Sequence, residues 1–434
     1  MMGAEMRRIK EGYKETEIGV LPEGWEVKNL GILSTLIDGD RGKNYPSPNE
    51  IVEDGILFLS TSNIQDNNLT LSTTKFITKE KFNKLGKGKI LQKDLVITLR
   101  GTLGSVMIFE TEEYETAFIN AQMMIIRPNE IVHYKYLYQT MISKVIKEQI
   151  SKTSSGSAQP QLTKKDIINL IIPLPSFLEQ QRIAGILSAT DAHIEKLDDI
   201  IKDTQLLKKG MMRSLFTEGI GHTEFKNTEI GRIPKAWEVS KINDIADYVG
   251  SGVTPRGGAS VYKCKGITFI RSQNVYPNKL VLDDVVFIDD EINKKMKRTM
   301  LQELDILLNI TGASIGRSAV LPIGFGKSNV NQHVCIIRLN KSSDPYFLCQ
   351  FLNSIFARKQ IDSYNGGSSR EGLNFKQVRN IMLPLPSLTE QQEIAEILSA
   401  IDDRIQLYEK EKEDFTNLKK GLMEQFLTGE IRVL

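Results

Sequence analysis

A capped helical segment occurs twice in this 434-residue chain, and the two copies lie 211 positions apart. The copies span residues 173–215 and 384–426, and each begins with a Pro-Leu-Pro-Ser run. In both copies a Ser is followed three residues later by a Glu, which is the spacing of a capping box: Ser176 with Glu179, and Ser387 with Glu390. We therefore predict that a long helix begins at each of these serines.

Behind each cap, apolar residues recur in alternating steps of four and three, the spacing of a coiled-coil seam. The predicted seam residues are Ile183, Leu187, Ile194, Leu197 and Ile201 in the first copy, and Ile394, Leu398, Ile401, Ile405, Tyr408 and Phe415 in the second. The pattern is then expected to skip one residue and to resume at Leu207 and Met211 in the first copy and at Leu418 and Leu422 in the second. Because so narrow a seam cannot form a core alone, we expect the two helices, each about 60 Å long, to pair with each other. The alternative is two surface helices that pack on separate domains.

The segments that precede the helices also repeat, so the chain consists of one unit written twice. Residues 16–27 return as residues 228–239, and we expect the Trp in each copy, Trp25 and Trp237, to anchor a body on its core. Short apolar runs that end at Gly indicate buried strands, and helices are expected at about residues 134–149 and 346–360. The predicted fold class is α+β, with a mostly antiparallel sheet and short helices in each body. The predicted domains are residues 1–175 and 220–386 for the bodies, and 176–219 and 387–434 for the helices.

The net charge of +2 is unevenly distributed along the chain. The bodies carry +1 and +7, whereas the helical segments carry −1 and −5. This polarity suits bodies that contact phosphate and helices that do not. The chain has no run of 18 apolar residues and no apolar segment near its start, so we expect neither a membrane span nor a secretory signal. Three scattered cysteines, Cys264, Cys335 and Cys349, are expected to be reduced core thiols of a cytoplasmic protein.

Motifs of catalysis and of metal or cofactor binding are not found in the sequence. The chain lacks a complete phosphate-binding Walker motif, a dinucleotide-binding Gly pattern and the Asn-Pro-Pro-aromatic tetrapeptide of amino-methylating enzymes. Its four histidines are isolated, and no carboxylate cluster resembles a metal nuclease centre. We therefore expect this chain itself to be non-catalytic and to hold neither a metal nor a cofactor.

The double repeat resembles the specificity subunit of type I restriction-modification enzymes. The resemblance covers essentially the whole chain, and its strongest motifs are Pro-Leu-Pro-Ser-x-x-Glu-Gln-Gln at each junction and Leu-Lys-Lys-Gly at residues 207–210 and 418–421. It implies that each body is a target-recognition domain that reads one half of a bipartite site in double-stranded DNA. It also implies that the helices form an antiparallel coiled coil with internal pseudo-twofold symmetry. This coil would set the half-site spacing and dock two methyltransferase subunits.

The resemblance further implies that the chemistry belongs to partner subunits. The methyltransferases would carry S-adenosylmethionine and methylate adenine at N6, and restriction subunits with a motor would use ATP and Mg to cut unmethylated DNA. Two alternatives stay open. One is the recognition part of a fused restriction-methylation enzyme, and the other is a coiled-coil adaptor whose bodies bind protein.

The candidate DNA contacts rest on side-chain chemistry, because the recognition loops of the family vary too much for contacts to be transferred residue by residue. Arg, Lys, Asn, Gln, Ser and Thr at loop tips can pair with base edges or phosphates. The candidates in the first body are Arg41, Lys43, Asn63, Arg100, Gln122, Ser155 and Ser157. Those in the second body are Thr254, Arg256, Arg271, Asn274, Thr311, Arg317, Gln332 and Arg370. The alternative for each is a solvated or turn-capping side chain.

Overall fold

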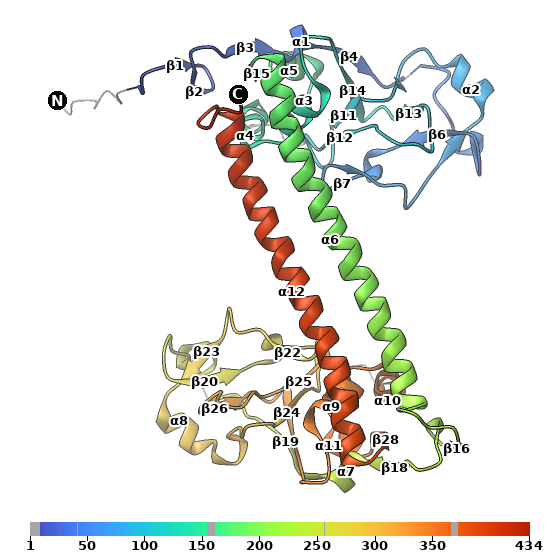
Figure 1. Ribbon diagram of the computed structural model, residues 1–434, viewed down its shortest axis with the longest axis vertical. Coiled ribbons are helices and arrows are strands. Elements are labelled where there is room, and N and C mark those ends of the chain that lie inside the picture. The colour runs from blue at the N-terminus through green and yellow to red at the C-terminus, as the bar shows by residue number, and fades with distance from the viewer. Residues whose placement is uncertain (1–8, 41, 154–160, 256, 366–371) are drawn as a thin grey trace, which may run out of the picture. The chain divides into compact units, whose positions relative to one another are not determined.

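The computed structural model describes residues 9–40, 42–153, 161–255, 257–365 and 372–434, and it divides into two compact units. Unit 1 comprises Met1–Lys196 with Glu411–Leu434, and unit 2 comprises Leu197–Lys410. Each unit therefore contains one body of sheets and short helices, together with half of each long helix (Figure 1).

The body of unit 1 is built on a four-stranded antiparallel sheet with the strand order β12-β11-β14-β4. A second sheet has the order β10-β13-β6-β9-β5, in which only the β6–β13 pair is parallel. The antiparallel pairs β1–β2, β3–β15 and β7–β8 complete the strands. The strand bounds are β1 Tyr13–Thr16, β2 Gly19–Pro22, β3 Glu26–Asn29, β4 Ser34–Asp38, β5 Ile51–Val52, β6 Ile56–Leu59, β7 Ile64–Gln65, β8 Asn68–Leu69, β9 Phe76–Ile77, β10 Lys89–Ile90, β11 Leu95–Thr98, β12 Val106–Ile108, β13 Ala117–Ile119, β14 Met123–Pro128 and β15 Ile171–Leu174.

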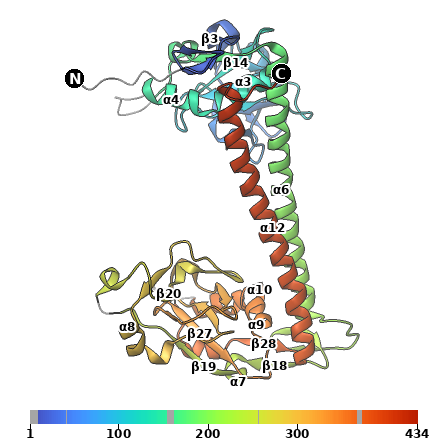
Figure 2. The same cartoon turned by 60° about the vertical axis from the view of Figure 1, so that its left-hand side comes forward.

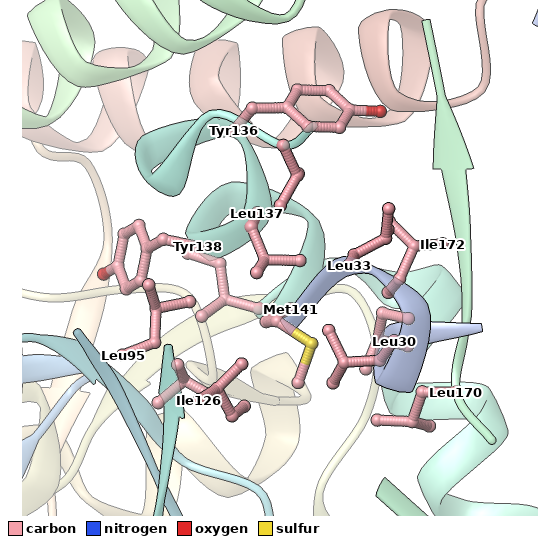
Figure 3. Packing of buried hydrophobic residues seen from close by; sticks show 14 of the residues in the cluster. Leu30, Leu33, Leu95, Ile126, Tyr136, Leu137, Tyr138, Met141, Leu170 and Ile172 are labelled. Atoms are coloured by element: carbon pink, nitrogen blue, oxygen red, sulfur yellow. The ribbon is translucent and has the colours of Figure 1, made fainter. Parts of the chain in front are cut away.

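The four-stranded sheet of unit 1 is buried on both faces, which explains the nearly continuous apolar sequence of its central strand β11. Leu95 and Ile97 face a core that is closed by helices, whereas Val96 faces the core shared with the second sheet. Figure 3 shows Leu95 and Ile126 beneath side chains of α3. The helices of this body are α1 Leu30–Leu33, η1 Pro48–Glu50, η2 Thr61–Asn63, α2 Lys79–Lys84, α3 Tyr134–Met141, α4 Lys144–Thr153 and α5 Lys164–Ile168.

The body of unit 2 repeats this arrangement with a smaller second sheet. Its four-stranded antiparallel sheet has the order β19-β27-β24-β25, and its second sheet has the order β23-β20-β26 with a parallel β20–β26 pair. The strand bounds are β16 Phe225–Thr228, β17 Gly231–Pro234, β18 Glu238–Lys241, β19 Ala246–Ser251, β20 Ile267–Ile270, β21 Val275–Tyr276, β22 Lys279–Leu280, β23 Val286–Ile288, β24 Ile306–Asn309, β25 Ser318–Val320, β26 Ser328–Val330, β27 Val334–Leu339 and β28 Met382–Leu385. The helices are α7 Ile242–Ile245, η3 Gly258–Val261, η4 Ser272–Asn274, α8 Asp290–Lys295, η5 Lys297–Thr299, η6 Gly312–Ser314, α9 Pro345–Leu352, α10 Ile355–Asn365 and α11 Phe375–Arg379.

The predicted α+β class and mostly antiparallel sheets are confirmed, but the prediction of one continuous helix near residues 134–149 and 346–360 is wrong. Each body has two short helices there, α3 and α4 or α9 and α10. Ser354 Oγ accepts hydrogen bonds from the backbone N–H groups of Phe356 and Ala357, so this serine begins a new helix. Ser143 is the residue at the same place in unit 1.

The two long helices are α6 (Phe177–Thr217, 41 residues) and α12 (Leu388–Leu427, 40 residues). In unit 1 the first half of α6 lies beside the last half of α12, and in unit 2 the last half of α6 lies beside the first half of α12 (Figures 1 and 2). The helices are therefore antiparallel in each unit, which confirms the predicted pairing. Of the predicted seam residues, seven are buried and four are partly exposed: Ile183, Leu187, Leu197, Ile201, Ile394, Leu398 and Ile405 are buried, and Ile194, Ile401, Tyr408 and Phe415 are partly exposed.

The predicted skip in the seam is wrong at Leu207 and Leu418, whereas Met211 and Leu422 are partly buried against the cores. Leu207 and Leu418 are 58% and 50% exposed, so they do not continue the seam. The steps of four and three continue instead through Lys208 and Lys419, whose side chains are only 11% and 17% exposed. Sequence reasoning passed over these two residues because a lysine at a core position contradicts the apolar pattern.

Candidate DNA interface

A hydrogen-bonded polar cluster lies at one edge of the four-stranded sheet of unit 2. Thr254 Oγ1 donates a hydrogen bond to Gln332 Oε1, and Gln332 Nε2 lies 3.1 Å from His333 Nε2. His333 Nδ1 lies 2.6 Å from Thr311 Oγ1. Thr254 follows β19, Thr311 follows β24, and Gln332 and His333 precede β27, which is the strand between them. The structure thus brings together three of the predicted residues with His333, which sequence analysis did not single out.

A basic cleft opens beside this cluster and shares Thr254 with it. The cleft encloses about 1110 Å³ between the loop Val253–Pro255 and the segment 292–299 of α8 and η5. Lys295, Lys297 and Arg298 are exposed cations on its wall, and none of its described lining residues is acidic. Such a cleft attracts an anionic backbone. The sequence analysis also missed these three cations, because a run of charges resembles any solvated helix end.

Unit 1 has a cleft of about 560 Å³ at the same place in the fold, between the segment after β4 and the segment after α2. Its lining includes Lys87 and Lys164. The carboxylate of Asp40 accepts hydrogen bonds from the backbone N–H groups of Gly42 (2.7 Å) and Gly86 (2.9 Å), and these bonds lower its pKa from the ordinary value. Asp40 therefore ties the two walls of the cleft together as an anion.

Three further candidates lie at the tips of unit 1. Arg100 is exposed, and its Nε donates to Oε1 of Gln161, a lining residue of the cleft, at 2.9 Å. Lys43 and Gln122 are also exposed. In unit 2, Arg317 is partly exposed, with its guanidinium 5.2 Å from the centre of the Tyr276 ring. All four side chains keep groups that a nucleic acid could approach.

The structure does not support Asn63 and Asn274 as base readers. Both are buried, and both close the turn that follows a strand of the second sheet. Asn63 accepts a bond from the Ser60 N–H and donates to two backbone carbonyls, and Asn274 accepts from the Arg271 N–H and donates to Val281 O and Asp284 Oδ1. Their bonding capacity is used inside the body, so their role is turn capping.

Arg271 is likewise engaged inside unit 2. Its Nη2 donates to the backbone oxygen of Asp284 at 2.7 Å, and its guanidinium lies 5.8 Å from the centre of the Tyr262 ring. The structure therefore assigns it to holding the loop around Asp284. The remaining candidates lie outside the described residues: Arg41, Ser155, Ser157, Arg256 and Arg370.

The first turn of α6 in unit 1 is closed by a network that the sequence analysis misread. Glu179 is 1% exposed, and its carboxylate forms two hydrogen bonds with the Arg432 guanidinium at 2.7 and 2.8 Å. Trp25 Nε1 donates to the same carboxylate at 3.1 Å. Burial alone would raise the pKa of Glu179, but the bonds from Arg432, Trp25 and the Val433 N–H outweigh it and lower the pKa.

Unit 2 has the corresponding network at the first turn of α12. Glu390 accepts hydrogen bonds from Trp237 Nε1 at 2.9 Å and from the backbone N–H of Ile220 at 3.0 Å, and it lies 2.9 Å from His222 Nε2. Gly219, with φ at 67°, lets the chain turn out of α6 against Trp237, where an added Cβ would lie 2.5 Å from the ring.

The predicted capping boxes are thus only half right. Ser176 Oγ and Ser387 Oγ accept hydrogen bonds from the backbone N–H groups of Glu179 and Glu390, as predicted. The two carboxylates bind the tryptophans and the segments that follow the opposite helices rather than the cap N–H groups. One sequence signal could have revealed the bond between glutamate and tryptophan. In both copies a Trp-Glu-Val run enters the body, and a Pro-Leu-Pro-Ser-x-x-Glu run begins the helix.

Each unit also exposes apolar side chains on its helix pair. Ile186 (38%) and Leu418 (50%) are exposed in unit 1, and Ile397 (36%) and Leu207 (58%) are exposed in unit 2. The two pairs are related by the 211-residue repeat. Each of these residues immediately precedes a seam position, so it flanks the seam.

The described residues form neither a metal-binding cluster of His, Cys, Asp or Glu nor a membrane-spanning helix. Among these residues, no three His, Cys, Asp or Glu side chains gather where they could hold a metal ion. No helix in the described ranges is both long and apolar enough to cross a membrane.

Known proteins share both the sequence pattern and the fold. A family model described as the type I restriction modification DNA specificity domain matches residues 22–203 and 234–416. The chain is 30% identical to the putative type I restriction enzyme MjaX specificity subunit of Methanocaldococcus jannaschii, over 98% of this chain and 97% of that protein. It is 22% identical to the EcoKI specificity subunit of Escherichia coli strain K12, over 95% and 90% of the two chains. The crystal structure of the type I restriction-modification S subunit from M. genitalium matches with a TM-score of 0.60 at 14% identity, over 93% of this chain and 96% of that chain. The chain therefore belongs to the family of type I restriction modification DNA specificity domains, which it contains in two copies.

Proposed function

We propose that this protein is the DNA-recognition subunit of a type I restriction-modification complex. Each body reads one half of a bipartite site in double-stranded DNA, and the paired helices set the number of unread base pairs between the halves. The chain is non-catalytic in this proposal. Partner subunits supply adenine N6 methylation with S-adenosylmethionine, and restriction subunits supply DNA cleavage with ATP and Mg.

The observation that carries this proposal is the presence, in each body, of polar side chains at loop tips beside a cleft with lysines in its lining. The described lining of the unit 2 cleft has no acidic residue, whereas that of unit 1 has two aspartates beside its two lysines. Thr254, Thr311 and Gln332 stand beside Lys295 in unit 2, and Arg100 and Gln161 stand beside Lys87 in unit 1. Polar groups at the tips suit base edges, and cations in the cleft suit phosphates. The scaffold repeats whereas the tip residues differ, as two readers of different half-sites require.

The exposed apolar residues of the helix pair support docking of two copies of one methyltransferase subunit. Ile186 with Leu418 in unit 1, and Ile397 with Leu207 in unit 2, present equivalent chemistry once per unit. Across the seam from them, Asp191 and Asp402 bind the bodies through Gln139 and Gln350, so the apolar residues are on the flank that the bodies leave open. A repeated apolar surface fits a partner that binds twice.

The cysteines support the proposed cytoplasmic location. Cys335 and Cys349 are buried, as predicted, whereas Cys264 is exposed, so the prediction of a core thiol is wrong there. Burial raises the pKa of the Cys335 and Cys349 thiols to about 12. Such thiols stay protonated at neutral pH and are poor nucleophiles. They therefore serve as small packing groups, which is the role expected of cysteines in a reducing compartment.

The experiment that tests the proposal is a methylation map. The full chain is expressed with its methyltransferase in a host that lacks N6-adenine methylation, and modified adenines are located by sequencing. A bipartite motif with a fixed unread gap is the expected result. Methylation at a continuous site would refute two independent readers, and the absence of methylation from an assembled complex would refute the function itself.

A matched pair of variants tests whether unit 2 reads one half of the DNA site. Gln332→Ala is expected to relax the sequence preference in only one half of the motif, because the bodies read separately. Lys294→Gln, an exposed residue of α8 that does not line the cleft, serves as the control and should leave both halves unchanged. An unaltered motif in Gln332→Ala would remove this residue from the reading surface.

A further inference from the structure

A charged hydrogen-bond network occurs once in each unit, and neither network belongs to the recognition loops. In unit 1, Gln139 Nε2 donates to Asp191 Oδ2 at 2.7 Å, and Lys419 Nζ lies 2.5 Å from Asp191 Oδ1. In unit 2, Gln350 Nε2 donates to Asp402 Oδ2 at 2.7 Å, and Lys208 Nζ lies 2.6 Å from both carboxylate oxygens. All three residues of one network are offset from those of the other by 211 positions.

Each network joins three elements that are far apart in the sequence. The glutamine comes from the body (α3 or α9), the aspartate from the long helix that leaves that body, and the lysine from the antiparallel helix. In unit 1 these elements are α3, α6 and the last half of α12. One carboxylate therefore receives a donor from the body and a cation from the opposite helix. A displacement or rotation of any of the three elements breaks at least one of these bonds.

The position of the lysines indicates that the networks fix the register of the helices in addition to stabilising the fold. Lys208 and Lys419 occupy seam positions where an apolar residue would pack, and their side chains are 11% and 17% exposed. Desolvating such a charge offsets most of the attraction it gains, so an apolar set is often equally stable. An apolar seam, however, tolerates several registers, whereas a buried polar pair is satisfied in only one.

The two networks differ in how far they extend into the body. Gln350 Oε1 accepts a hydrogen bond from Asn278 Nδ2 at 3.1 Å, and Asn278 sits at φ 59° in the turn between β21 and β22. The buried Gln139 Oε1 has no hydrogen-bond partner among the described residues. The network of unit 2 thus reaches a hairpin of the body, while that of unit 1 ends at the glutamine.

We propose that these two networks are positioning devices that hold each body in one orientation on the helix pair, and that this rigidity sets the discrimination between DNA gap lengths. This inference rests on the proposed function. Gln139, Asp191, Lys419 and their counterparts touch no base in the proposal. They act by preventing a body from swinging to a half-site that lies one base pair too near or too far.

The test replaces the network of unit 1 by apolar groups in the full chain, with Gln139→Leu, Asp191→Leu and Lys419→Met combined. Methylation by the assembled complex is measured on three DNAs, with the native gap, one base pair more and one base pair less. We expect the thermal midpoint to be unchanged or raised, because the charges are removed together. Discrimination against the wrong gaps should fall by about tenfold, the size of a typical coupling between residues of one network.

The control is Lys420→Met, which makes the same substitution at the next, exposed residue and should leave discrimination intact. A charge swap, Asp191→Lys with Lys419→Asp, covers the case in which the apolar variant does not fold. The free Gln139 Oε1 can accept from a lysine at position 191, so the swap should keep discrimination that Asp191→Lys alone loses. Retained discrimination in a folded apolar variant, or no rescue by the swap, would overturn the positioning role. A wild-type complex without a fixed gap would instead refute the proposed function.

Discussion

Removing Arg432 should loosen the end of α12 from the start of α6 in unit 1. Its guanidinium forms both hydrogen bonds to a Glu179 carboxylate that is 1% exposed. Breaking a buried pair by removing one partner costs about 3–5 kcal/mol. Arg432 itself is 32% exposed, and Trp25 and the Val433 N–H still serve the carboxylate, so we expect Arg432→Ala to cost about 2–3 kcal/mol. For a unit of this size that lowers the Tm by about 5–10 °C.

The assay is unfolding of the full chain in a Trp237→Phe background, in which Trp25 is the sole tryptophan and reports on unit 1. Glu430→Ala, an exposed neighbour, is the control and should stay within about 0.5 kcal/mol of the background. Adding Glu179→Gln to Arg432→Ala should recover about 1–2 kcal/mol, because the unpaired charge is removed. A loss of unfolding free energy below about 0.5 kcal/mol for Arg432→Ala, or no recovery in the double variant, would refute the role of the Arg432–Glu179 pair in holding the two helix ends together.

Four other outcomes follow from the same geometry. Because the pKa of Glu179 is lowered from 4.5, its stabilising contribution is present above that pH and is lost as the pH falls through the lowered value; the stability difference between the background and Arg432→Ala should therefore shrink in acid unfolding. Combined Gln substitutions at Lys295, Lys297 and Arg298 should reduce the slope of log affinity against log salt by about 2–3, with Lys294→Gln unchanged, and an unaltered slope would exclude phosphate contacts in the cleft. Inserting seven residues after Thr204 and seven after Phe415 keeps the heptads and adds about 10 Å, so the methylation motif should gain about three unread base pairs, and an unchanged gap would refute the spacing role. Leu207→Glu with Leu418→Glu should abolish co-purification of the methyltransferase while the Tm stays within about 2 °C, whereas undiminished binding would exclude this surface.

The architecture was predictable because its signals are periodic and duplicated. The capped helices, the tryptophan anchors and the buried strands each occur twice in the same order, and this duplication distinguishes them from chance patterns. The break between α3 and α4 was missed because a polar residue inside an amphipathic pattern looks like a helix surface position. In unit 2, Ser354 begins a helix only because the preceding helix ends at Leu352, with Asn353 as its C-cap, and a single sequence does not mark this end.

The candidate site was less predictable, because loop-tip chemistry depends on neighbours that the sequence does not place. Asn63 and Asn274 have the right chemistry for reading adenine, yet both are buried and their side chains form hydrogen bonds within turns. The sequence around Thr254, Thr311 and Gln332 does not mark them as DNA contacts any more clearly. The strand order nevertheless brings all three to one edge of the sheet, where His333 links Gln332 to Thr311. Residue type alone does not separate these two outcomes.

The two glutamates at the helix starts show why local reasoning fails where antiparallel helices meet. The helix dipole favours a carboxylate in the first turn whether its side chain accepts a hydrogen bond from the cap N–H or faces outward. What decides the competition is the end of the opposite helix, which antiparallel pairing brings to the same place. Arg432 reaches Glu179 from 253 residues away, and His222 reaches Glu390 from 168 residues away. Each carboxylate thereby joins a helix start, a body's tryptophan and the chain leaving the other helix. A specificity subunit needs its bodies held rigidly on its helix pair, and these junctions, together with the lysine networks along the seam, place charged hydrogen bonds where body and helix pair meet.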